Sequence, residues 1–172
     1  TTSNTFKSIL NLEAWASAAA MASGQRNGAG FGTQTALVFA AGIGPGGPAI
    51  ATTQEYNGNG WSTATDYPTS TYNLSGFGTL TAGAAVGGYP SENATKEYDG
   101  TNWTAGGNYP TGIHSLSTHG TQTAAIAAGG SPAVTTSATY NGTAWTATPG
   151  SLNTGRGMGG MAGTTTAAVL MG

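Results

Sequence analysis

The hexapeptide Tyr56-Asn57-Gly58-Asn59-Gly60-Trp61 returns 42 residues later as Tyr98-Asp99-Gly100-Thr101-Asn102-Trp103, and after the same interval as Tyr140-Asn141-Gly142-Thr143-Ala144-Trp145. Asn-Gly and Asp-Gly readily adopt the positive φ of tight β-hairpin turns. Each copy therefore predicts a hairpin in which Tyr ends one strand and Trp opens the next. Self-similarity at a period of about 20–50 residues is typical of repeat architectures, so the chain is predicted to consist of successive copies of one small β unit.

Each repeat adds two further β segments to this hairpin. A run of small residues that closes on glycine predicts a strand buried on both faces, and its copies lie at 33–42, 79–88, 121–130 and 164–172. The remaining strand of each unit is predicted between the Trp strand and the next small-residue run, at 71–77, 112–119 and 154–161. A unit of four short antiparallel strands and this length is one blade of a β-propeller.

The two ends of the chain are complementary parts of one such unit. Trp15 precedes Phe31 by sixteen residues, as Trp61 precedes Phe77, so the N-terminal segment 6–20 is predicted to supply a third and fourth strand. Segment 156–172 supplies a first and second strand. We expect one all-β domain, a four-bladed propeller with units near 24–66, 67–108 and 109–150 and a composite blade of 151–172 with 1–23. The alternative is half of a larger ring, completed by a second chain.

Composition excludes several classes of function. The chain has 172 residues, of which only four are basic and six acidic, giving a net charge of −2. Without a basic patch, nucleic-acid binding is not expected. No apolar run approaches the roughly 20 residues of a transmembrane helix, so no membrane insertion is expected. There is no Cys, which rules out disulfides and thiolate metal sites.

One set of repeat-related positions differs in residue type from copy to copy. Eleven residues after each Trp stand Arg26, Tyr72, His114 and Arg156. Equivalent positions on successive blades face a common axis, which predicts a ring of hydrogen-bond donors at the mouth of a central channel. Such side chains suit a carboxylate, a sulfate or sugar hydroxyls. The alternative is that each Arg binds neighbouring backbone carbonyls and holds the blades together.

The aromatic residues fall into a repeated and a loop group. An aromatic that recurs at one position of a repeat is ordinarily core between units, and this group comprises Trp15, Trp61, Trp103, Trp145, Tyr56, Tyr98 and Tyr140. Tyr67, Tyr89 and Tyr109 each precede a Pro in a predicted loop. Because loops on rigid scaffolds often carry function, these three are candidates for stacking against a sugar.

No catalytic or metal constellation emerges from the sequence. His114 and His119 are five residues apart, an odd separation that points strand side chains to opposite faces. Glu13, Glu55 and Glu97 fall on separate units, so an acid/base pair of the glycosidase type is not expected. No phosphate-loop, metalloprotease or serine-hydrolase motif is present. We expect no enzyme activity, no metal and no cofactor.

The repeats resemble kelch-type propeller units. The resemblance rests on Gly87-Gly88 and Gly129-Gly130 closing a strand, followed by Tyr and Trp at fixed spacing, with Ala41-Gly42 as a departure. Arg26 and Arg156 match the Arg that often opens the family's first strand. The amino-acid composition, rich in Gly, Thr and Ala and nearly uncharged, is similar to that of kelch-like repeats in phage virion and tail proteins.

This resemblance implies a structural or adhesive propeller on a virion surface or otherwise extracellular. Its expected partner is a host-cell glycan or another virion protein, and a homo-oligomer is compatible with it. The alternatives are a secreted domain that binds or modifies glycans at the channel mouth, and a kelch adaptor that binds other proteins. A superfold hosts many activities, so the repeat alone does not choose among them.

Overall fold

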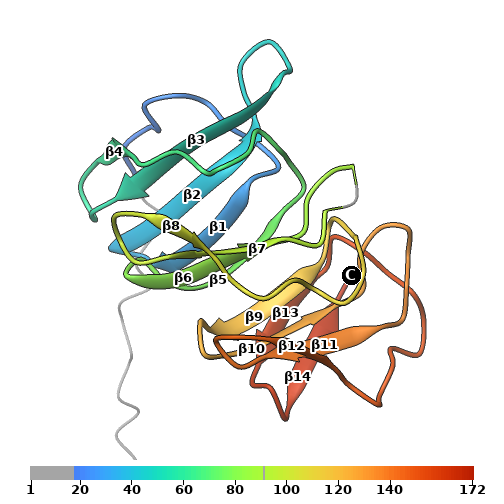
Figure 1. Cartoon of the computed structure of the whole chain (residues 1–172). Helices are drawn as coiled ribbons and strands as arrows, with labels where there is room; N and C mark the ends of the chain where they lie inside the picture. The colour runs from blue at the N-terminus through green and yellow to red at the C-terminus, as the bar shows by residue number, and fades with distance from the viewer. Residues whose placement is uncertain (1–17, 91) are drawn as a thin grey trace, which may run out of the picture.

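The computed structural model describes residues 18–90 and 92–172. These residues form fourteen β-strands and no helix, arranged as three four-stranded antiparallel sheets and one two-stranded sheet (Figure 1). Within each sheet the strands follow one another in chain order, each paired with the next. The predicted all-β unit of four short antiparallel strands is therefore confirmed for the three internal repeats.

The strand bounds show how closely the sheets repeat. The first sheet contains β1 (Ala29–Thr33), β2 (Ala36–Ile43), β3 (Ala49–Tyr56) and β4 (Trp61–Ala64). The second contains β5 (Ser75–Thr79), β6 (Ala82–Val86), β7 (Thr95–Tyr98) and β8 (Trp103–Ala105). The third contains β9 (Ser117–Thr121), β10 (Ala124–Ala128), β11 (Ser137–Tyr140) and β12 (Trp145–Ala147). The two-stranded sheet pairs β13 (Gly160–Gly163) with β14 (Ala168–Met171).

The quoted hexapeptides form the predicted hairpins. Tyr56 pairs with Trp61 across the first turn, and the other two copies pair in the same register. The Asn57 side-chain oxygen accepts hydrogen bonds from the backbone N–H groups of Asn59 and Gly60, each at 3.0 Å. Asp99 and Asn141 accept the equivalent bonds in their turns. Short polar side chains that bond their own backbone in this way fix the turn, and hence the register of the outer two strands.

The first strand of each unit begins later than the sequence pattern predicted. The expected segments started at residues 71, 112 and 154, whereas β5, β9 and β13 begin at Ser75, Ser117 and Gly160. The physical reason is a residue with positive φ shortly before each strand, because left-handed backbone interrupts an extended chain. These residues are Asn73, Ser115 and Met158, with φ of 61°, 58° and 62°.

The apolar core lies between sheets. Two clusters of buried residues exist among the described residues, one between the first and second sheets and one between the second and third. In the first cluster Trp103 meets Phe31 of the preceding sheet edge-on, with ring centroids 6.1 Å apart, and meets Tyr67 at 4.9 Å. The second cluster repeats this contact with Trp145, Phe77 and Tyr109. Trp103 and Trp145 are scaffold, as their periodicity predicted.

A partly buried hydrogen bond accompanies each of these interfaces. The Tyr98 hydroxyl donates to Glu55 at 2.6 Å, and the Tyr140 hydroxyl donates to Glu97 at 2.5 Å. Each Tyr belongs to the sheet that follows and each Glu to the sheet that precedes. Burial and the nearby carboxylate raise the pKa of both tyrosines, that of Tyr140 to about 12. Glu55 and Glu97 thus link neighbouring units.

The first strands of the units lie side by side around a common line. β1 packs beside β5, β5 beside β9, and β9 beside β13 (Figure 1). Side chains reinforce this order: the Thr118 hydroxyl donates to the Gly76 carbonyl at 2.9 Å, and the Ser117 hydroxyl to the Gly159 carbonyl at 2.7 Å. No comparable contact joins β13 to β1 within the described part of the chain. The sheets therefore form a propeller-like arc. The predicted strands within 6–20 and Trp15 lie outside the described residues, apart from 18–20.

The Tyr140–Glu97 bond makes stability depend on high pH. Because the folded pKa of Tyr140, about 12, exceeds the usual ~10 of an unfolded tyrosine, its stabilising effect is complete below pH ~10. It is lost as the pH rises through the folded pKa. Tyr140→Phe should lower the free energy of unfolding at pH 7 by about 1–3 kcal/mol, since it leaves Glu97 without its donor. It should also flatten the loss of stability above pH ~10.

Urea denaturation between pH 7 and 12 measures both effects. Glu97→Gln is the matched control, because it keeps an acceptor oxygen and removes the charge, and it should give an intermediate loss. Equal high-pH slopes for wild type and Tyr140→Phe would contradict the assignment.

Candidate functional site

The residues with positive φ before the first strands are joined by a chain of backbone hydrogen bonds. The Asn73 N–H donates to the Asn27 carbonyl at 2.6 Å, the Ser115 N–H to the Asn73 carbonyl at 2.8 Å, and the Met158 N–H to the Ser115 carbonyl at 3.0 Å. We call these four residues the junctions. Each comes from a different unit, so the bonds fix how successive units stand around the common line. Asn is common in left-handed backbone, which explains Asn27 and Asn73.

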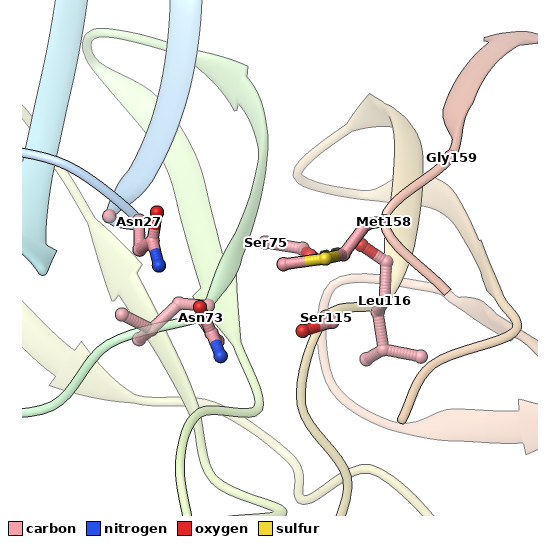
Figure 2. Close-up of a pocket in the computed structure, with 9 residues that line it drawn as sticks. Asn27, Asn73, Ser75, Ser115, Leu116, Met158 and Gly159 are labelled. Atoms are coloured by element: carbon pink, nitrogen blue, oxygen red, sulfur yellow. Dashed lines mark hydrogen bonds between the residues drawn. The ribbon is translucent and has the colours of Figure 1, made fainter. Parts of the chain in front are cut away.

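The junctions surround a cavity of about 170 Å³ at one end of this line. We call it the axial pocket. Figure 2 shows Met158 and Ser115 pointing from one side toward Asn27 and Asn73 on the other. Two carboxamides, two serine hydroxyls and a thioether thus belong to its lining, and no charged side chain lines it among the described residues. This lining suits an uncharged ligand that both donates and accepts hydrogen bonds.

One polar atom of this pocket lacks a partner. The Asn73 Oδ1 atom is buried and accepts no hydrogen bond from any described residue. A buried acceptor left unpaired costs about 1–3 kcal/mol. The accessible area of Asn73 Oδ1 is below 1 Å², so a donor from a ligand or a water reaches it only when the Asn73 side chain turns toward the pocket. Sugar hydroxyls and amide N–H groups are such donors.

Three rings from two units, of which Tyr89 is exposed and Tyr72 and His114 are half-buried, form a surface beside the pocket. Tyr72 and Tyr89 stack with centroids 4.8 Å apart and 22° between planes, and His114 meets Tyr89 edge-on at 5.6 Å. The Tyr89 N–H donates to the Tyr72 carbonyl at 2.8 Å, so backbone pairing holds the stack. The Tyr89 side chain is 46% exposed. We call Tyr72, Tyr89 and His114 the aromatic platform.

The platform and the axial pocket are connected through His114. Its Nδ1 atom lies 3.0 Å from the Ser115 hydroxyl, which lines the pocket, and its ring packs against Tyr89. Two of the four residues predicted for the channel mouth therefore come together with one of the three predicted loop aromatics.

Neither arginine of the predicted ring is among the residues that line the axial pocket. Arg26 lines a separate hollow with Ile43 and Pro45. The Arg156 guanidinium donates to the Gly172 carbonyl at 2.8 Å and its Nε–H to the Thr154 carbonyl at 3.3 Å, which is the structural role weighed as the alternative. Relative to its junction, Arg156 also lies one position earlier than Tyr72 and His114 do. Met158 comes thirteen positions after Trp145, whereas Asn73 comes twelve positions after Trp61. Gly157 stands where Tyr72 and His114 stand in their units.

Two of the loop aromatics are corrected by their burial. Tyr67 and Tyr109 are 4% and 3% exposed, because each packs edge-on against the Trp of the following sheet. Their rings are thus unavailable to a ligand at the surface. Desolvation raises the pKa of Tyr109 to about 12, in keeping with this burial. Tyr89 remains exposed because its ring faces Tyr72 and His114 instead of a Trp.

The acidic and histidine residues do not assemble a second site. Within the described ranges there is no group of three His, Asp or Glu residues placed to hold a metal ion, and Glu55 and Glu97 accept the tyrosine hydroxyls described above. No helix in residues 18–90 and 92–172 is long and apolar enough to span a membrane. In comparisons with known proteins, the chain matches neither a protein-family model nor a curated sequence.

Met158 carries backbone strain at the pocket. A bulky side chain in left-handed backbone costs roughly 1–2 kcal/mol, and Asn tolerates this conformation better. Because Met158 is 72% exposed, its replacement sacrifices little burial. Met158→Asn should therefore raise the free energy of unfolding by about 1 kcal/mol in urea denaturation.

Met171→Asn is the control for this prediction. Met171 is also an exposed methionine, at 59%, but it lies in strand β14 with extended backbone and should give no gain. Equal changes in both variants would mean that strain at Met158 is not the cause.

Proposed function

We propose that this protein is a non-enzymatic adhesive module that binds a neutral glycan at the aromatic platform and the axial pocket. Its sheets would act as blades of a kelch-type propeller on a virion or another extracellular surface. The observation that carries the proposal is the exposed Tyr72–Tyr89 stack joined through His114 to a polar, uncharged cavity. This site lies at positions whose residue type differs from one repeat to the next. The aromatic residues that recur in every repeat lie between the sheets and form the scaffold.

The platform offers what a sugar ring needs on one face. Tyrosine presents a large, rigid apolar face at small conformational cost and keeps a polar edge for hydrogen bonds. Tyr89 is 46% exposed, yet stacking on Tyr72 holds its ring in place before any ligand arrives. Preorganisation of this kind improves affinity by reducing the ordering cost of binding.

The axial pocket offers the complementary polar contacts. Asn27 and Asn73 both line the pocket and carry both donors and acceptors. Carboxamides and hydroxyls recognise sugar hydroxyls or an acetamido group without needing charge. Because no charged side chain lines the pocket among the described residues, binding should depend little on salt.

A virion or other extracellular location is supported by composition and by the kelch-like repeat style. Only 6% of the residues are charged, and Thr, Ala, Gly and Asn are the most frequent exposed residues among those that the structure describes. We found no pair of carboxylates poised for glycoside hydrolysis in the described residues, since Glu55 and Glu97 bond tyrosines of other units. These observations favour adhesion over modification of a glycan.

Tyr89→Ala tests the platform. Removing one stacked ring should weaken glycan binding about threefold to tenfold, the range expected from ~0.5–1.5 kcal/mol per aromatic contact. The measurement is a screen of the full chain on an array of neutral and sialylated glycans, followed by calorimetry on the best neutral ligand at 50 and 500 mM salt.

Two sets of controls make the result specific. Met171→Ala removes a side chain of similar exposure, outside the platform, and should bind as wild type. Arg26→Ala and Arg156→Ala test the arginine site predicted from the sequence, and both should also bind as wild type. Undiminished binding by Tyr89→Ala, or a ligand that depends on the arginines, would overturn the proposal.

A further inference from the structure

His119 occupies a position that is buried in the other units. It follows Ser115 by four residues, as Phe31 follows Asn27 and Phe77 follows Asn73. Phe31 and Phe77 are 5% and 3% exposed because the Trp of the next sheet covers each of them. His119 is exposed, and no ring among the described residues packs on it at this interface. The third sheet thus has the face that a following sheet covers in the other units, but no Trp packs on it among the described residues.

A groove lies where that Trp is missing. A hollow of about 360 Å³ separates the third sheet from β13–β14, and His119, Thr121, Ala124, Gly163 and Thr165 are among its lining. A second hollow of about 350 Å³ continues over Thr123, Thr139 and Tyr140. We call the two together the end groove. Small residues, Thr, Ala and Gly, make up most of its lining, which leaves room for an aromatic ring and an extended strand.

The strand that follows the groove-lining turn at 164–166 is apolar and uncovered. In β14, Val169 and Met171 are 63% and 59% exposed, whereas the equivalent strands β6 and β10 are largely buried. β6 and β10 each pair with a third strand, and β14 has no such partner within the described residues. An exposed apolar edge strand is a template for pairing with another segment.

The sequence contains a segment of the required kind at its other end. Trp15 precedes Asn27 by twelve residues, as Trp61 precedes Asn73 and Trp103 precedes Ser115. Residues before Trp15 correspond to the third strand of a unit, which is the strand that β14 lacks. Segment 1–17 therefore has the right order and spacing to complete the last unit and to place a Trp over His119.

The residues that follow this segment indicate which copy it can reach. The Ala19 carbonyl accepts the Trp61 indole N–H at 3.1 Å, just as the Thr65 carbonyl accepts that of Trp103 at 3.1 Å. Thr65 directly follows the outer strand of the preceding sheet, so Ala19 holds the position in the repeat that comes after an outer strand. The end groove lies at the opposite end of the arc, beyond the third sheet (Figure 1). β13 and β1, the first strands of the two end units, have no comparable contact in the described part of the chain.

We propose that the end groove binds the N-terminal segment of a second copy of this chain, with Trp15 of the partner subunit packed on His119. Each copy then presents a groove at one end and an inserting segment at the other, a head-to-tail contact that closes into a ring or continues as a filament. The contact is separate from the aromatic platform and does not rest on the proposed glycan binding.

Photo-crosslinking identifies the occupant and its source. The full chain is made with p-benzoylphenylalanine in place of Trp15, irradiated at several concentrations, and analysed by intact mass and peptide mapping. We expect a crosslink to residues 119–124 or 163–166 in a species of twice the chain mass, increasing with concentration. A crosslink to the same residues at the mass of one chain would show that the chain's own segment fills the groove, and crosslinks elsewhere would show that the groove takes a different occupant. Either result overturns the proposal.

Complementation between variants tests the direction of the contact. Trp15→Ala should weaken self-association in sedimentation velocity by at least about tenfold, as expected for a buried aromatic anchor, and His119→Ala by about threefold to tenfold. His119→Phe, which restores the residue found in the other units, should strengthen it. His114→Ala is the matched control: it removes the other histidine, on the platform, and should assemble as wild type.

Mixing the two weakened variants gives the decisive result. The groove of Trp15→Ala is intact and the N-terminal segment of His119→Ala is intact, so the mixture should form heterodimers joined at one contact and nothing larger. A mixture that behaves as the sum of its parts, or a wild-type chain that remains monomeric at all concentrations, would refute the head-to-tail contact.

Discussion

The packing of one tryptophan against the sheet that precedes it is the contact on which the rest of this structure depends. A four-stranded antiparallel sheet of these short strands cannot bury its apolar face alone, so each sheet is stable only beside a neighbour. Trp103 and Trp145 supply that neighbour contact by filling the space between a phenylalanine and a loop tyrosine. The apolar core is consequently divided among interfaces, and stability is shared between adjacent pairs of sheets.

This arrangement separates scaffold from surface. The turns and interfaces repeat because the same backbone path and the same ring contact are needed in every unit. Around the common line the requirement is only a left-handed residue and a backbone hydrogen bond, so the neighbouring side chains are free to differ. Tyr72, Tyr89 and His114 meet there because equivalent positions of adjacent units lie next to one another. A ligand site at that place changes no contact that holds the sheets together.

The hairpins, the four-stranded units and the role of the repeated aromatics were predictable from sequence, because Asn-Gly turn chemistry and a fixed spacing are local signals. The burial of Tyr67 and Tyr109 was missed, although the two are also 42 residues apart; the period itself assigns them to the scaffold. The residues equivalent to Tyr89 in the neighbouring units are Ile43 and Ser131. Because the residue type is not repeated, this position is free for function. The last unit has one extra residue after Trp145. Counting eleven positions from each Trp therefore reaches Arg156, although Gly157 is the residue equivalent to Tyr72 and His114. The axial pocket depends on four junctions far apart in sequence, so only the folded arrangement reveals it.

The first unit contains four more residues between Gly42 and Tyr56 than the second contains between the equivalent Gly88 and Tyr98. These residues form the loop around Pro45-Gly46-Gly47-Pro48 and lengthen β3. The Tyr56–Trp61 pairing and the packing on the second sheet are nevertheless the same as in the other units. A change of chain length at this edge is therefore not transmitted to the neighbouring sheet. The loop is accordingly a natural position for peptide display, where a foreign sequence can be inserted while the interfaces, the platform and both ends of the arc stay intact.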